Sequence, residues 1–240
     1  MKMISPLAKK LVPADKSNYT QGRKGYKICK FTPHHMAGVL TGEQCAKLFQ
    51  NPKRNASANY CIGNDGSLVC SVEEENRSWA SSSSWNDCQA ITVEVSNSSR
   101  GGQWPISEAA WNTLVELAVD VCTRYNFRLE YTKTKNGSLT MHNMYAATAC
   151  PGPYLKSKMD ELARVVNDRL DNKNKKLEDD ETKEDGRYHK LEEVPEWGKP
   201  TIEKLIKAGA LQGDENADLN LSHDMLRIFV IDDRMGVYDK

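Results

Sequence analysis

A long polar and charged run between residues 168 and 194 constrains this chain more than any other feature. Residues 172–181 read NKNKKLEDDE, and the run as a whole offers few apolar side chains. Such a segment cannot bury a core, so it is either a flexible linker or a solvated helical extension. We therefore expect a domain over residues 1–167, a charged linker over 168–194 and a small module over 195–240.

Strand signals in the first part indicate that it contains a sheet. Ile91, Val93 and Val95 alternate with Thr92 and Glu94, which predicts a strand with one apolar face and one polar face. Residues 26–32 read as a second strand, and residues 58–62 and 67–72 flank an Asn-Asp-Gly turn that predicts a hairpin.

Helix signals lie between these strands. Residues 106–125 carry a long apolar stripe that begins after Ser107, a good N-cap, and residues 154–170 predict a second long helix. Strands mixed with packed helices predict an α/β fold for residues 1–167. Residues 195–240 carry two short helical patterns, so we expect a mostly helical module that is marginally stable alone.

Composition describes an ordinary water-soluble protein. The chain is 39% hydrophobic and 28% charged, and no apolar run approaches the roughly 18 residues of a membrane span. The N-terminus has no signal-peptide core, so we expect synthesis in the cytoplasm. Residues 1–165 carry 20 Lys/Arg and 14 Asp/Glu, a basic excess that suits an anionic polymer, but no nucleic-acid motif accompanies it. We expect neither a nucleic-acid partner nor a membrane partner.

Histidine and cysteine residues indicate a metal site. Three of the five histidines, His34, His35 and His142, fall in two short segments, and Cys150 follows in a loop rich in small residues. Taken alone, each is more typical of a protein core. Together, imidazole and thiolate suit Zn²⁺ better than calcium or magnesium, which take oxygen ligands. Because neighbouring strand residues point to opposite faces, only one of the His34–His35 pair should bind, which leaves an open position typical of catalytic zinc.

Three segments carry a resemblance to a known family. They are residues 31–38 (FTPHHMAG), residues 91–95 (ITVEV), and His142 followed by residues 147–152 (ATACPG). In this order and spacing they resemble the zinc-dependent type 2 N-acetylmuramoyl-L-alanine amidases, a family shared by phage endolysins, bacterial autolysins and peptidoglycan recognition proteins. The resemblance covers residues 26–167.

The resemblance implies a fold and an activity. It implies a mixed central sheet flanked by helices, and hydrolysis of the amide between the lactyl group of N-acetylmuramic acid and L-alanine in bacterial peptidoglycan. It favours His34 over His35, with His142 and Cys150, as the zinc ligands. Zinc chemistry fits this reaction, since the ion activates water and polarises a carbonyl.

The resemblance also assigns the remaining site residues. Glu94 would be the general base; from the sequence alone it is equally well a solvent-facing strand carboxylate. Family members with a catalytic tyrosine carry it where this chain has Ala58, which leaves the base role to Glu94. Thr148 would donate a hydrogen bond to the oxyanion, and otherwise it is an ordinary loop residue. Trp79 and Asn86 are expected in the substrate cleft.

The resemblance predicts a phage or prophage endolysin, released from the host cytoplasm through a phage-encoded membrane pore to reach the wall. Two alternatives stay open, a recognition module that binds peptidoglycan without cutting it and a zinc endopeptidase that cuts within the stem peptide. Residues 197–227 resemble an S-layer-homology-type repeat, so the C-terminal module is expected to bind the wall or to form a homo-oligomer.

Overall fold

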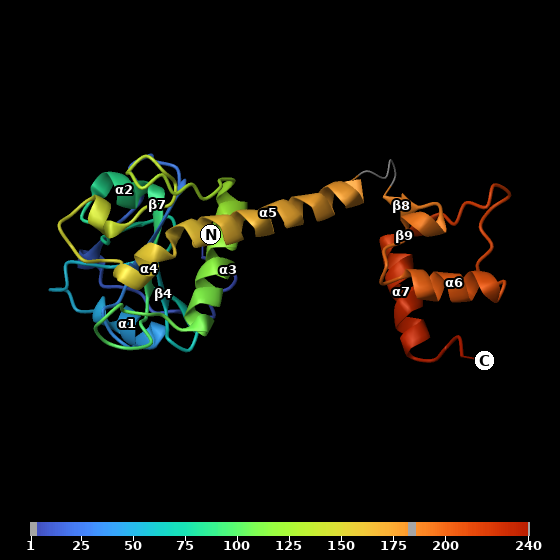
Figure 1. The fold of residues 1–240 in the computed structure, drawn as a ribbon, viewed down its shortest axis with the longest axis horizontal. Helices are drawn as coiled ribbons and strands as arrows, with labels where there is room; N and C mark the ends of the chain where they lie inside the picture. Colours follow the sequence, from blue (N-terminus) through green and yellow to red (C-terminus); the bar gives the residue numbers. More distant parts are fainter. Residues whose placement is uncertain (1–3, 182–185, 240) are drawn as a thin grey trace. The chain divides into compact units, whose positions relative to one another are not determined.

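The computed structural model describes residues 4–181 and 186–239 (Figure 1). It divides into two compact units, Met1–Asp171 and Asn172–Lys240. Within the part of the chain that is described, every helix is too short or too polar to span a membrane.

A five-stranded mixed sheet forms the centre of the first unit (Figure 1). Its strands, in spatial order, are β1 (Lys10–Leu11), β5 (Leu68–Cys70), β4 (Tyr60–Ile62), β7 (Ala90–Val95) and β3 (Lys30–His35). Only the β5–β4 pair is antiparallel, as the hairpin signal predicted; the other neighbours run parallel. The expected mixed sheet flanked by helices is confirmed.

One face of the sheet is covered by two long helices. Phe31, Ile91 and Val93 point to this face and pack in one core with apolar residues of α3 (Glu108–Tyr125) and α5 (Met159–Glu181). All three strand side chains are fully buried, so burial of apolar area holds the helices against the sheet.

The ends of these helices follow local signals. Helix α3 begins after Ser107, whose hydroxyl accepts the Ala110 amide at 3.1 Å, and it ends at Asn126 in the left-handed conformation. The predicted helix over residues 154–170 is two helices, α4 (Pro153–Ser157) and the longer α5.

The other face is only partly covered. Helix α1 (Gly42–Leu48), which begins with a capping box formed by Thr41 and Gln44, packs Cys45 and Ala46 against Cys61 and Val69 of β4 and β5. Over β3 and β7 the same face carries a polar row. Because strand side chains alternate, the residues opposite the apolar core are Thr32, His34, Thr92 and Glu94. We call this part of the sheet the polar face.

The second unit contains two helices and a short strand pair. Its elements are β8 (Arg187–Tyr188), α6 (Lys199–Lys207), β9 (Leu221–Ser222) and α7 (His223–Arg234). Its buried core consists of Tyr188, Val194, Ile202, Leu205, Leu221, Leu226 and Val230.

The segment assigned to a linker over 168–194 continues α5 through Glu181, which is the helical extension that the sequence left open. The second module begins earlier than residue 195, because Tyr188 and Val194 belong to its core. These two apolar residues are isolated in a charged sequence, so their pairing with distant residues had no local signal. Before His142, an isolated bridge links Leu139 to Phe31 of β3.

Candidate metal centre

The three predicted ligands meet beside the polar face. Each of His34, His142 and Cys150 offers one ligand atom, and these three atoms lie within 4.8 Å of one another. Nδ1 of His34 is 3.4 Å from Sγ of Cys150, and the two imidazole rings lie 5.1 Å apart between centroids. Two nitrogens and one sulfur at this separation match the ligand set that Zn²⁺ prefers.

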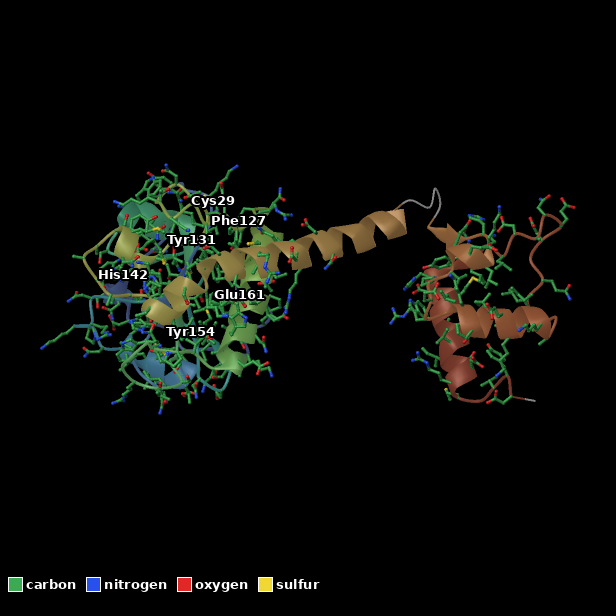
Figure 2. The ribbon with its side chains drawn as sticks, in the orientation of Figure 1. Cys29, Phe127, Tyr131, His142, Tyr154 and Glu161 are labelled. Atoms are coloured by element: carbon green, nitrogen blue, oxygen red, sulfur yellow. The ribbon has the colours of Figure 1, made fainter. Side chains whose placement is uncertain are left out.

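The chain brings these residues together from two directions. His34 lies near the carboxyl end of β3, whereas His142 begins a 3-10 turn, His142–Met144, on the surface of the first unit (Figure 2). The loop from His142 to Cys150 is closed by a hydrogen bond from the Asn143 amide to the Cys150 carbonyl, at 3.2 Å. The hydroxyl of Thr148 accepts the Cys150 amide at 3.2 Å. The loop geometry therefore fixes Cys150 opposite His34.

Burial shapes the charge state of the ligands. His34 is 1% exposed, and its Nε2 has no hydrogen-bond partner among the described residues. Burial, with smaller contributions from His142 and His35, lowers the pKa of His34 to about 3, which keeps the imidazole neutral and able to coordinate a metal. Burial, followed by the charge of Glu94, raises the pKa of Cys150 to about 12. A bound cation would reverse this second effect by favouring the thiolate.

Glu94 lies next to His34 on the polar face, because the two residues are paired across β3 and β7. Its Oε2 is buried and has no hydrogen-bond partner among the described residues. Burial raises the pKa of Glu94 to about 8, and the charge of Arg54 opposes that shift. An unpartnered buried carboxylate beside a group of residues able to hold a metal ion is a strong indication of a functional group.

These groups line one cavity of about 390 Å³. Its walls include His34, His35, Arg54, Trp79, Glu94, His142, Thr148 and Cys150. Trp79 is fixed by a hydrogen bond from its Nε1 to Thr20 Oγ1, at 2.9 Å, and the Arg77 guanidinium lies 5.8 Å from the centre of its ring. The structure thus brings six of the seven predicted site residues to one place.

Asn86 is the exception, and its predicted contact with substrate needs correction. It is fully buried and does not line the cavity. Its amide group donates to Thr32 and Ser81 and accepts from Thr140, each at 3.1 Å. Buried polar side chains need such partners, so Asn86 holds Thr32 of the polar face in place.

His35 lines the same cavity but is not part of the ligand group, as strand alternation predicted. Its ring packs edge-on against Trp104 at 5.3 Å between centroids. Gly152, with φ of 84°, lies against the same ring, and a Cβ added there would approach His35 Nδ1 to 3.2 Å. A side chain at position 152 would therefore be strained and crowded.

Two residues that touch the site were not anticipated. The Ser82 hydroxyl lies 3.2 Å from Nε2 of His142 and orients that ring. Arg54 reaches the cavity from the loop after α1, and its positive charge acts to lower the pKa of Glu94. Neither residue stands in a pattern that marks it, because a serine in a run of four and an arginine in a polar loop are common on surfaces.

Comparisons with known proteins agree with this geometry. A sequence profile of a family described as N-acetylmuramoyl-L-alanine amidase matches residues 24–153. No curated protein sequence matches the chain.

Solved structures share the fold of the first unit. The structure of PlyL is 18% identical, with a TM-score of 0.53 over 66% of this chain and 96% of that chain. The solution structure of the PlyG catalytic domain is also 18% identical, with a TM-score of 0.53 over 66% and 93%. A mutant endolysin from Bacillus subtilis is 16% identical, with a TM-score of 0.52 over 66% and 99%. At these identities the likeness establishes the fold.

Proposed function

Since this chain belongs to the N-acetylmuramoyl-L-alanine amidase family, we propose that it hydrolyses the amide between the lactyl group of N-acetylmuramic acid and L-alanine in bacterial peptidoglycan. One observation carries the proposal. A neutral His34, His142 and Cys150 converge in a cavity that also holds the unpartnered carboxylate of Glu94. A group of metal ligands with a base beside it suits metal-assisted hydrolysis of an amide.

The residues present fit a zinc ion. His34, His142 and Cys150 would hold it, since Nδ1 of the buried, neutral His34 lies 3.4 Å from Sγ of Cys150, a separation that suits two ligands of one ion. When bound, Zn²⁺ supplies Lewis acidity toward water and the scissile carbonyl. Ser82 fixes the ring of His142 through its hydroxyl.

Glu94 would move the proton. In the metal-free protein, burial raises the pKa of Glu94 to about 8, and a bound cation would favour its carboxylate form, which can take a proton from the attacking water near neutral pH. The same carboxyl group can then hand that proton to the amine of L-alanine as the amide bond breaks.

Thr148 and Trp79 would bind and orient the substrate. The Thr148 oxygen accepts the Cys150 amide, which leaves its hydroxyl proton able to donate to the developing oxyanion. Trp79 forms a rigid wall of the cavity.

The test is mass spectrometry of purified Gram-positive peptidoglycan after digestion, with and without a zinc chelator. We expect stem peptides that begin at L-alanine, peptide-free glycan, and loss of both products with chelator. Cuts within the stem peptide alone would identify an endopeptidase, and wall that is bound but uncut would identify a recognition module. Either of these results would overturn the amidase proposal.

The proposed setting is that of an endolysin. The protein would be made in the host cytoplasm and would reach the wall after release through a phage-encoded pore. The second unit would then add wall binding or association between copies.

A further inference from the structure

A second cavity lies on the second unit, outside the part of the chain that carries the metal ligands. It has a volume of about 390 Å³, within the range of ligand sites. Four of its lining residues, His223, Arg227, Ile231 and Arg234, recur every three or four positions along one side of α7. They form a strip about 16 Å long, since a helix rises 1.5 Å per residue. Trp197 and Val230 complete the lining.

The two arginines in this cavity are exposed and uncompensated. Among the described residues, neither Arg227 nor Arg234 makes an ion pair, and no acidic side chain lines the cavity. Lysines of the same unit behave differently, because Lys199 pairs with Glu196 and Lys204 pairs with Asp233.

The positive charge of this cavity contrasts with the net negative charge of the C-terminal part of the chain. Residues 191–240 hold 11 Asp/Glu and only 6 Lys/Arg. Two arginines that line one cavity about 10 Å apart along the axis of α7, neither of them in an ion pair among the described residues, indicate a site for an anion.

The cavity also has an aromatic wall. Trp197 is 44% exposed, and the ring of His223 meets it edge-on with centroids 5.7 Å apart. His223 is held in turn by its Nδ1, 2.9 Å from the hydroxyl of the buried Tyr188. A fixed indole surface suits the apolar C–H face of a sugar ring, which loses little on leaving water.

We propose that this cavity binds a sugar or polyol that carries an oxyanion, with Arg227 and Arg234 on the anion and Trp197 on the carbon skeleton. One source of such a ligand is the product of the proposed amide hydrolysis, and for that source the proposal rests on the proposed function. Hydrolysis breaks the lactyl C–N bond; the oxygen of water stays on the lactyl carbon as a carboxylate, and the protons leave on the alanine amine. Each cut therefore creates an anionic muramic sugar. The phosphates of a wall polymer are a second source.

Calorimetry on the zinc-loaded full chain tests the site. The probes are the N-acetylglucosamine–N-acetylmuramic acid disaccharide with a free lactyl carboxylate, the same disaccharide as its carboxamide, and a glycerol phosphate polymer. We expect at least one anionic probe to bind and the carboxamide to bind about tenfold more weakly or not at all. Arg227→Gln, Arg234→Gln and Trp197→Ala should each weaken binding about tenfold.

Lys207→Gln is the matched control, because it removes one positive charge from α6 outside the cavity. It should leave binding within about twofold of the original. Binding of the free carboxylate identifies the product glycan as the ligand, and binding of the phosphate polymer alone identifies a wall polymer.

Two results overturn the proposal: no anionic probe binds, or the arginine variants bind as well as the original chain. If the chain binds no anionic probe and sediments as a dimer, and Arg227→Gln dissociates that dimer, the strip on α7 is a contact between copies. Failure here is separable from failure of the proposed function, since wall digestion by the same sample reports amide cleavage independently.

Discussion

Two groups of buried polar side chains in the first unit are built in opposite ways. On the polar face, His34 Nε2 and Glu94 Oε2 are buried without hydrogen-bond partners among the described residues. Glu74 is also fully buried, but its carboxylate has several partners. We call Glu74 and the three side chains that bind its carboxylate, Tyr60, Arg124 and Tyr125, the Glu74 cluster.

The difference separates a structural cluster from a functional one. Arg124 binds Glu74 with two hydrogen bonds, at 2.6 and 2.7 Å, and Tyr125 donates a third at 2.6 Å. A buried charge with this many partners stabilises one arrangement of the chain. A buried carboxylate without partners costs free energy, so its presence at Glu94 points to a ligand or a reaction.

The largest expected effect is at the ligands. Cys150→Ser should abolish both bound zinc and hydrolysis, because serine is a poor ligand in a set built for sulfur. The loss of rate should exceed the roughly 10²–10⁴-fold that a general base supplies. Zinc content by atomic absorption and peptide release by mass spectrometry measure the two properties. Cys88→Ser, at another buried cysteine, is the control. Full activity with unchanged zinc in the Cys150 variant would refute the ligand assignment.

The second effect shows whether Glu94 acts as the general base or as a zinc ligand. Glu94→Gln should keep the zinc and lower kcat by about 10²–10⁴-fold, since glutamine has the shape of glutamate without its basicity. Loss of zinc in this variant would instead make Glu94 a ligand. Glu43→Gln, a carboxylate on α1 paired with Lys10 and Lys47, should change neither quantity.

The third effect belongs to the Glu74 cluster. Glu74→Ala should lower the free energy of unfolding by about 3–5 kcal/mol, because it leaves the Arg124 charge without its buried partner. The milder Glu74→Gln provides a folded variant for comparison, and Glu75→Gln tests the exposed neighbour. Urea denaturation measures stability, and activity per folded molecule should stay unchanged. A large loss of activity in folded Glu74→Gln would show that the two clusters are coupled.

These two clusters also mark what the sequence could predict. The alternation of Ile91, Val93 and Val95 with Thr92 and Glu94 determines which side chains face the core, so the polar face followed from local pattern. His142 and Cys150 could be grouped with the His34–His35 pair from their residue types, but the choice of His34 over His35 came from the family resemblance.

Contacts between distant residues left no such signal. Glu74 sits in a run of three glutamates that looks like a solvated surface, and its partner Arg124 lies 50 positions away. Asn86 looked like a cleft residue for the same reason, since only the folded chain surrounds it with Thr32, Ser81 and Thr140.

The fourth effect is a pH dependence of the metal-free protein. The folded-state pKa of Glu94, about 8, lies above its ordinary value of 4.5, so between these pH values the folded state holds a proton that the unfolded state has lost. This group therefore lowers stability as pH rises from about 4.5 to about 8, and the trend ends above that. Glu94→Gln removes the trend. Urea denaturation of both proteins in chelator, from pH 4.5 to 8.5, should show the variant gaining stability relative to the original chain; parallel curves would contradict the burial of this carboxylate.

The smallest effect tests whether the Glu74 cluster is as completely satisfied as its geometry indicates. The Tyr60 hydroxyl donates to Glu74 and accepts the Ser5 amide at 2.7 Å, so Tyr60→Phe removes two contacts at once without leaving a large void. Because Glu74 keeps Arg124 and Tyr125, the loss should be about 1–2 kcal/mol, well below that of Glu74→Ala. Tyr26→Phe, at an exposed tyrosine, should change stability by less than about 0.5 kcal/mol. If Tyr60→Phe costs as much as Glu74→Ala, the carboxylate depends on the tyrosine rather than on the arginine.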